Sequence, residues 1–303
     1  MAVRRFVSFA IYAGFLAAAL YLAFSAALVY LATRPESRKP FEAFPADLGL
    51  QYEDVAFTPR GEDLQLRGWF LPGAPGAPHL VFVHGIDSQR TASKALELAA
   101  RLVRDSGYNV LLFDLRAHGA SDGDLVTAGD RERYDVLGAY DFVVSRGAQP
   151  GRVGVLGRSY GAGIAIMAAA MEPGIAAVIA DSTFSSVEAK AAREVALRTP
   201  FPEWAVPVFK PAARVFADLL YDIDLGSLSP EHDVAGLAYP VLVIHGQDDS
   251  RTPLSQGRRV YEAAPRGSEL WAPAGVEHTQ AFADFPDEYL RRATAYLAAR
   301  LGQ

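Results

Sequence analysis

Residues 156–161 read LGRSYG, a Gly-x-Ser-x-Gly pattern whose central serine could act as a nucleophile. A mostly apolar run, 153–156, precedes the pattern, and a run of small residues with helical character, 162–170, follows it. This arrangement is typical of a nucleophile elbow, in which a serine on a tight strand-to-helix turn exposes its hydroxyl. We expect both glycines to be required, because a Cβ at either position would clash with the neighbouring strand and helix. Ser159 is therefore the candidate nucleophile.

A serine hydroxyl becomes a good nucleophile only when a histidine takes its proton and a carboxylate holds that histidine in the right tautomer. In enzymes with such an elbow, the order along the chain is serine, acid, histidine. Of the six histidines, only one follows the acid candidates at the end of the apolar run 241–244; the six are His79, His84, His118, His232, His245 and His278. This order makes His278 the candidate base.

The acid has three candidates, each directly after an apolar run that we expect to be a strand. Asp248 and Asp249 follow the run 241–244, and Asp181 follows the run 176–180. Side chains of neighbouring residues point in different directions, so we do not expect both Asp248 and Asp249 to serve. We favour Asp249, with Asp248 next and Asp181 third. The remaining aspartates would then do ordinary turn chemistry, in which the carboxylate satisfies loop backbone.

An ester or amide that is attacked by a serine also needs two backbone N–H donors for the developing oxyanion. The residue after the nucleophile, Tyr160, supplies one of them, and the loop after an early strand supplies the other. The sequence VFVHGI, 81–86, makes Ile86 the candidate for this second donor. We expect His84 to brace its loop, and Asp87 and Ser88 to cap the helix that follows.

Apolar runs and helical patterns alternate from residue 80 onward. We expect strands at 51–58, 64–71, 80–83, 108–113, 153–156, 176–180, 241–244 and 269–271, and helices at 92–102, 131–145 and 288–301. Such alternation predicts an α/β fold with a mostly parallel central sheet covered by helices on both faces.

About 58 residues separate Asp181 from Pro240, far more than an ordinary connection between a strand and a helix. This segment has helical patterns at 187–197 and 205–221 and is rich in aromatic residues, namely Phe201, Trp204, Phe209, Phe216 and Tyr221. We interpret 183–238 as a helical cap over the site. The alternative is a helical insertion that only packs on the domain, because aromatic residues at helical spacing are usually core.

Residues 6–32 contain no charged side chain and are long enough to span a bilayer, which needs about 20 apolar residues. We expect 1–33 to be an uncleaved, single-pass membrane anchor, 34–47 a linker with three prolines, and 48–303 the catalytic domain with its cap. The alternative is a cleaved signal peptide, whose apolar region is usually about 7 to 15 residues. Arginines precede the span and basic residues follow it, so the positive-inside rule gives no orientation.

Composition excludes other classes. The formal charge of -6 and a pI near 5.6 give no basic surface for nucleic acid. Without cysteine, the chain has no disulfide, thiolate metal site or cysteine nucleophile. Ser159, Asp249 and His278 need neither a metal nor an organic cofactor, and the sequence leaves the oligomeric state open.

Five stretches together resemble the α/β-hydrolase superfamily over nearly all of 51–301: VFVHGI (81–86), DLRAHGASDG (114–123), LGRSYG (156–161), IHGQDDSRTP (244–253) and GVEH (275–278). In similar proteins the acid lies three residues after the glycine of the HG turn, which supports Asp249. The loop around His118 is usually non-catalytic there. Such proteins often have small or polar residues after the early His-Gly, whereas this chain has Ile86 and Asp87.

The apolar N-terminal segment makes the chain similar to the membrane-tethered branch that includes monoacylglycerol lipase-like, depalmitoylase-like and serine aminopeptidase-type hydrolases. The resemblance implies a serine hydrolase that cleaves a carboxylic ester, with lipid and other acyl esters among the candidates. A thioester, amide or peptide on the same Ser-Asp-His triad is the alternative, because the fold hosts all these chemistries. A third possibility is a catalytically idle, membrane-tethered binding or scaffold module.

Overall fold

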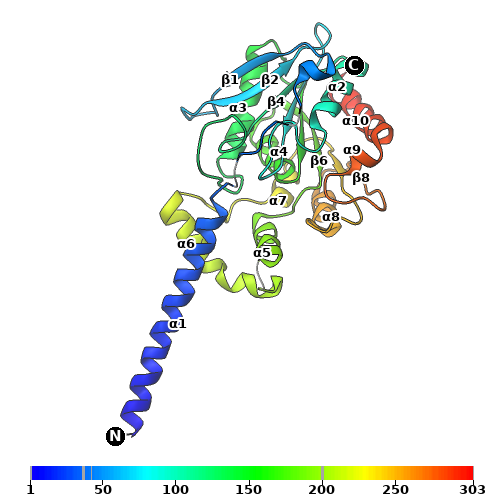
Figure 1. The fold of residues 1–303 in the computed structure, drawn as a ribbon. Helices are drawn as coiled ribbons and strands as arrows, with labels where there is room; N and C mark the ends of the chain where they lie inside the picture. Colours follow the sequence, from blue (N-terminus) through cyan, green and yellow to red (C-terminus); the bar gives the residue numbers. More distant parts are fainter. Residues whose placement is uncertain (1, 36–37, 42, 199–200, 303) are drawn as a thin grey trace.

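The computed structural model describes residues 2–35, 38–41, 43–198 and 201–302, and is built around one eight-stranded sheet (Figure 1). The strand order is β1-β2-β4-β3-β5-β6-β7-β8. The strands are β1 Glu53–Phe57, β2 Leu66–Leu71, β3 His79–Val83, β4 Asn109–Phe113, β5 Val153–Arg158, β6 Ile175–Asp181, β7 Leu242–Ile244 and β8 Glu269–Trp271. The α/β fold with a mostly parallel sheet is confirmed, with each strand at its expected place.

The pairing of the strands brings the candidate residues to one edge of the sheet. β1 and β2 pair antiparallel, as do β2 and β4, whereas β4, β3, β5, β6, β7 and β8 run parallel to their neighbours. All six residues of β5 are buried, because helices cover both faces of the sheet at its centre. The carboxyl ends of the parallel strands meet at one edge, and the loops that leave this edge carry Ser159, Asp249 and His278.

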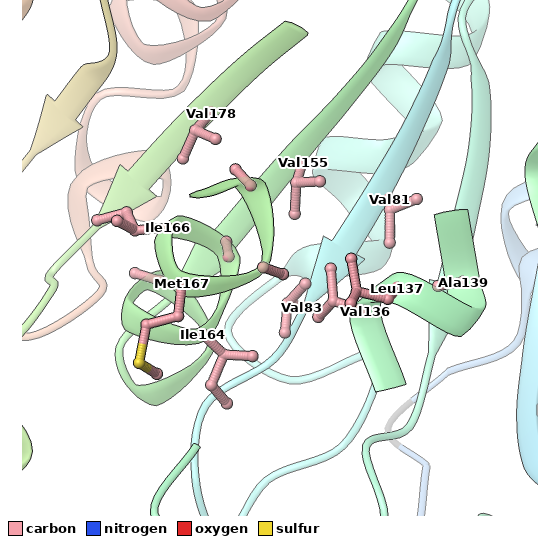
Figure 2. Close-up of a cluster of buried hydrophobic side chains, with 14 of the residues drawn as sticks. Val81, Val83, Val136, Leu137, Ala139, Val155, Ile164, Ile166, Met167 and Val178 are labelled. Atoms are coloured by element: carbon pink, nitrogen blue, oxygen red, sulfur yellow. The ribbon is translucent and has the colours of Figure 1, made fainter. Parts of the chain in front are cut away.

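Two apolar layers hold helices against the faces of the sheet. The helices are α2 Ala95–Ser106, α3 Glu132–Ser145, α4 Tyr160–Met171, α8 Leu254–Ala263, α9 Ala281–Asp284 and α10 Pro286–Leu301. Figure 2 shows one layer, in which Val81 and Val155 of the sheet face Val136 of α3 and Ile164 of α4. The other layer packs α2, α9 and α10 against the opposite face. Each Val, Ile or Leu side chain that is fully buried in such a layer stabilises the fold by about 1.5 to 3 kcal/mol.

The start of α2 differs from the expectation. The helix begins at Ala95, and its N-cap residue is Lys94, which has a left-handed backbone and makes no capping bond with its side chain. The prediction that Asp87 and Ser88 cap this helix is therefore wrong. The intervening residues form turns instead, in which the side chain of Gln89 accepts hydrogen bonds from the backbone N–H and the hydroxyl of Thr91.

Between β6 and β7 the chain forms α5 Val187–Arg198, the 3-10 helix η2 Glu203–Phe209, α6 Lys210–Tyr221 and the short α7 Pro230–Val234. α7 lies against α4, whereas α5, η2 and α6 extend away from the sheet (Figure 1). We call α5, η2 and α6 the cap. Glu188 of α5 forms ion pairs with Lys210 and Arg214 of α6, which connect the first and last helices of the cap. Residues 199 and 200 of the predicted cap lie outside the described residues.

The N-terminal segment forms one helix, α1 Ala2–Ala32, which is long and apolar enough to cross a membrane. Its N-terminal part projects away from the rest of the protein, and its C-terminal part lies beside α6 (Figure 1). The following segment includes the short 3-10 helix η1 Pro45–Leu48, and Arg38 donates to the carbonyl of Gly119 at 2.8 Å. Residues 36, 37 and 42 of the predicted linker lie outside the described residues.

Candidate active site

Ser159 stands at the junction of β5 and α4 in a strained backbone conformation. Its φ of 54° and ψ of -118° lie outside the regions that most residues adopt, at a cost of about 1 to 3 kcal/mol. The surrounding structure holds this conformation: the backbone N–H of Ser159 donates to the carbonyl of Asp181 at 2.8 Å. The sharp turn exposes the hydroxyl at the end of the sheet.

Both glycines of the pattern sit where a side chain cannot fit. A Cβ on Gly157 would lie 2.2 Å from the carbonyl oxygen of Gly161 in α4. A Cβ on Gly161 would lie 2.3 Å from the carbonyl oxygen of Val83 in β3. Both distances are far below van der Waals contact, so the helix can approach the sheet this closely only without these side chains. The expected clash with the neighbouring strand and helix is confirmed.

The structure brings Ser159, His278 and Asp249 into one hydrogen-bonded row. The Nε2 atom of His278 lies 2.7 Å from Oγ of Ser159, and its Nδ1 atom lies 2.7 Å from Oδ2 of Asp249. Asp249 is in the loop after β7, and His278 is in the loop after β8. With the proton of the neutral imidazole on Nδ1, donated to Asp249, Nε2 is free to accept the hydroxyl proton of Ser159.

Hydrogen bonds keep the carboxylate of Asp249 ionised. Burial alone would raise its pKa, but hydrogen bonds from the side chains of His245 and His278 and from the backbone N–H of Thr252 hold the pKa well below its usual range. The other oxygen, Oδ1, accepts the N–H groups of Thr252 at 2.7 Å and Arg251 at 3.1 Å. The side chain therefore has one orientation, with Oδ2 directed at His278.

The two other acid candidates, Asp248 and Asp181, have different surroundings from Asp249. Asp248 is exposed, whereas its neighbour Asp249 is buried. Asp181 is fully buried; its carboxylate accepts from the hydroxyls of Ser182 at 3.1 Å and Tyr289 at 3.2 Å. Burial raises the pKa of Asp181, and the nearby Arg158 opposes this rise.

The loop after β3 places the second candidate oxyanion donor close to Ser159. A Cβ on Gly85 would lie only 3.3 Å from Cβ of Ser159, so the backbone of this loop passes directly beside Ser159. Ile86 follows Gly85, and both residues line a cavity that Ser159 also lines. Tyr160 is the first residue of α4, and N–H groups in the first turn of a helix have no acceptor within that helix.

Two histidines fix this loop. Nε2 of His84 accepts the N–H of Leu115 at 3.0 Å, which leaves its Nδ1–H to donate to the carbonyl of Gly85 at 2.7 Å. His118, in the loop after β4, also holds the loop after β3, because its Nε2 accepts the N–H of Asp87 at 3.2 Å. The expectation that His84 braces its loop is confirmed, and His118 is a second brace that the sequence did not reveal.

A further buried histidine lies next to Asp249. His245 is completely buried, and its Nε2–H donates to the carbonyl of Thr252 at 2.8 Å. The same nitrogen is 3.4 Å from Oδ2 of Asp249. His245 thus supports the turn that presents Asp249. Its position in the HG pair at the end of β7 was the only sequence signal for this role.

The Ser159 side chain lines a cavity of about 600 Å³. The walls come from the loop after β3, from His278 and Thr279, and from two outlying parts of the chain. The cap contributes Glu194 and Leu197, and the segment after α1 contributes Lys39. Within the described ranges, no cluster of three or more His, Asp or Glu side chains could hold a metal ion.

Comparison with known proteins points to one superfamily. The family model of X-Pro dipeptidyl-peptidases (S15 family) matches residues 69–208. The uncharacterised protein YqkD of Bacillus subtilis is 26% identical over 255 residues, which cover 82% of this chain and 80% of that protein. The lysophosphatidylserine lipase ABHD12 of Danio rerio is 28% identical over 199 residues, covering 64% of this chain and 49% of that protein.

Among solved structures, the esterase Pf2001 of Pyrococcus furiosus superposes with a TM-score of 0.72 at 26% identity. The match covers 89% of this chain and 99% of the esterase. The resemblance seen in the sequence is thus supported by a family model, by relatives and by a three-dimensional match. The chain belongs to the α/β-hydrolase superfamily.

Proposed function

We propose that this protein is a membrane-anchored serine hydrolase that cleaves a carboxylic ester through an acyl-enzyme. The observation that carries the proposal is the row Ser159–His278–Asp249, with 2.7 Å at each of its two contacts. A serine, an imidazole and a carboxylate in this order have the geometry for nucleophilic acyl transfer. The similarity to the Pyrococcus furiosus esterase supports an ester as the substrate.

In the acylation step, Oγ of Ser159 attacks the carbonyl carbon of the ester while Nε2 of His278 takes the hydroxyl proton. The negative charge moves to the carbonyl oxygen, which the N–H groups of Ile86 and Tyr160 bind. The intermediate then collapses, the carbon–oxygen bond to the alcohol breaks, and His278 gives its proton to the leaving alcohol. Asp249 orients the imidazole and stabilises its positive charge throughout.

Deacylation repeats the same steps with water as the nucleophile. His278 takes a proton from water, the hydroxide oxygen attacks the acyl carbon, and the bond to Oγ breaks. The proton returns from His278 to Ser159 and the carboxylic acid leaves. The chain therefore needs no cofactor to complete the cycle.

Membrane anchoring rests on α1. The part of α1 that could span a membrane is Val3–Ala32, which is uncharged from residue 6 onward, and most of its large apolar side chains are exposed, as they would be toward lipid. The related ABHD12 of Danio rerio is named a lysophosphatidylserine lipase, which supports a lipid ester among the substrates. If α1 spans the bilayer, the full chain stays in the membrane pellet after alkaline carbonate extraction, whereas release into the supernatant contradicts the anchor.

A second candidate activity is cleavage of amides or peptides. The match to a family of X-Pro dipeptidyl-peptidases over 69–208 favours it, since that segment includes Ser159 and the loop of Ile86. Thioesters would use the same residues.

The activities are separated by comparing hydrolysis of nitrophenyl esters of short and long acyl chains with an acyl thioester and an X-Pro nitroanilide. The proposal predicts ester turnover that Ser159→Ala abolishes. A nitroanilide turned over faster than every ester would favour the peptidase alternative. Absence of turnover on every substrate would favour an idle, membrane-tethered binding or scaffold module.

A further inference from the structure

The outer side of the cap exposes large apolar side chains. They are Trp204, Val208, Val215, Leu219 and Leu220, with exposed fractions between 52% for Leu220 and 82% for Trp204. We call these five residues the cap apolar surface. All five lie in η2 and α6, and apolar exposure concentrated in this way marks sites of contact with a membrane or another protein.

Two of these residues share one side of α6. Val215 and Leu219 are one helical turn apart, and Val208 lies in the preceding 3-10 helix η2. Ala217 on the other side is buried, and Phe216 is partly buried against the core. Helix α6 thus packs one side against the protein and leaves Val215 and Leu219 exposed on the other.

The same part of the cap is attached to α1. The hydroxyl of Tyr21 donates to the carbonyl of Val208 at 3.0 Å, and the ring of Tyr21 stacks on Phe209 with centroids 5.6 Å apart. The ring of Phe24 lies 4.7 Å from that of Phe209. The contact holds η2 and α6 beside the part of α1 that leaves the domain (Figure 1).

The length of α1 fixes where a bilayer would lie. Residues 3–20 of α1 are all exposed, and contacts with the cap begin at Tyr21; the uncharged part of this exposed stretch, 6–20, is about 22 Å long at 1.5 Å per residue. The hydrocarbon core of a bilayer is about 30 Å thick. A span that begins after Arg5 therefore ends near residue 25, which places the near interface at the level of the cap contacts of Tyr21 and Phe24. Tyr and Trp side chains prefer this level, where Trp204 of the cap would also lie.

We propose that the cap apolar surface rests in the headgroup region of the bilayer that α1 enters. The inference rests on the proposed anchor, and it goes further by assigning the cap to the lipid surface. Leu197 of the cap both lines the cavity of Ser159 and is half exposed. The cap thus contributes an apolar side chain to the cavity, and a cap at the lipid surface gives the cavity an amphiphilic ester resident in that membrane as its substrate.

The test uses tryptophan quenching in the full chain, reconstituted into phosphatidylcholine vesicles with acyl chains brominated near the headgroup. The chain has three tryptophans. Trp69 is buried, and Trp271 is partly buried among the rings of Phe285 and Tyr289, so only Trp204 is placed for contact with lipid. We expect bromine to quench the native emission, Trp204→Phe to lose most of that quenching, and the matched control Trp271→Phe to retain it.

Three results would overturn the inference: no bromine quenching of the native chain, equal quenching of Trp204→Phe and native protein, or cap-to-cap crosslinking with an unquenched Trp204. The last result would assign the surface to a second copy of the chain. Carbonate extraction on the same sample separates this failure from failure of the anchor. A chain that resists extraction while Trp204 is not quenched has a spanning α1 and a cap outside the bilayer.

Discussion

The substitution Asp249→Asn isolates the role of one carboxylate while preserving its shape. In the structure, Oδ2 accepts the Nδ1–H of His278 at 2.7 Å and Oδ1 accepts the N–H of Thr252 at 2.7 Å. An asparagine can keep its oxygen toward the backbone donor, which leaves its NH₂ group facing His278. The imidazole must then accept at Nδ1 and carry its proton on Nε2, where it cannot take the proton of Ser159.

The expected loss follows from the tautomer. An imidazole with the wrong tautomer lowers kcat by about 10⁴ in enzymes that use this chemistry, which corresponds to about 5.5 kcal/mol in the activation free energy. KM changes far less, because Asp249 is shielded from the cavity by His278. Thermal unfolding also changes little, because the bonds to Thr252 and Arg251 can persist.

The assay is hydrolysis of a soluble nitrophenyl ester by the detergent-solubilised full chain, with kcat and KM measured separately. Asp248→Asn is the matched control, because it makes the same chemical change one residue away at an exposed position. We expect its kcat to equal that of the native chain. A large loss in Asp248→Asn, or near-native turnover in Asp249→Asn, would refute the reasoning.

Two further predictions concern the scaffold. Gly161→Ala places a Cβ 2.3 Å from the carbonyl oxygen of Val83 and should lower the free energy of unfolding by about 3 kcal/mol. The control Gly236→Ala meets only an ordinary contact at 3.5 Å and should have the melting temperature of the native chain. Equal melting temperatures for the two variants would contradict the packing argument. Burial and the nearby His118 lower the pKa of His84 from 6.5 to about 4. Between these two pH values His84 is protonated in the unfolded chain but not in the folded chain. The free energy of unfolding therefore falls by about 3 kcal/mol as the pH drops from 6.5 to 4. In denaturant titrations at several pH values, His84→Gln should lose less stability than the native chain over this window, and identical slopes would contradict the shift.

Much of the fold could be predicted because its signals are local. The strand β5 and the helix α4 follow from an apolar run and a run of small residues on either side of Ser159. The order of motifs along the chain singled out His278, which the structure places 2.7 Å from the serine. In both cases, residues close in sequence or constrained by chain order carried the information.

Features that depend on the direction of a side chain or on contacts between distant parts of the chain could not be predicted from the sequence. Asp248 and Asp249 have the same chemistry, and only the turn that ends in Thr252 decides which one is buried. His118 braces a loop that is 31 residues away in sequence. The contact between Tyr21 and Phe209 joins segments far apart in the chain. Periodicity and motif order contain no information on such pairings, because tertiary packing creates them.

The most direct test of the central claim is the site of covalent labelling by a fluorophosphonate, which reacts with an activated serine. After labelling of the full chain, proteolysis and mass spectrometry locate the adduct. We expect an adduct on Ser159 that is absent from Ser159→Ala and strongly reduced in His278→Ala, since the imidazole activates the hydroxyl. An adduct on another residue, or equal labelling of the native chain and Ser159→Ala, would contradict it.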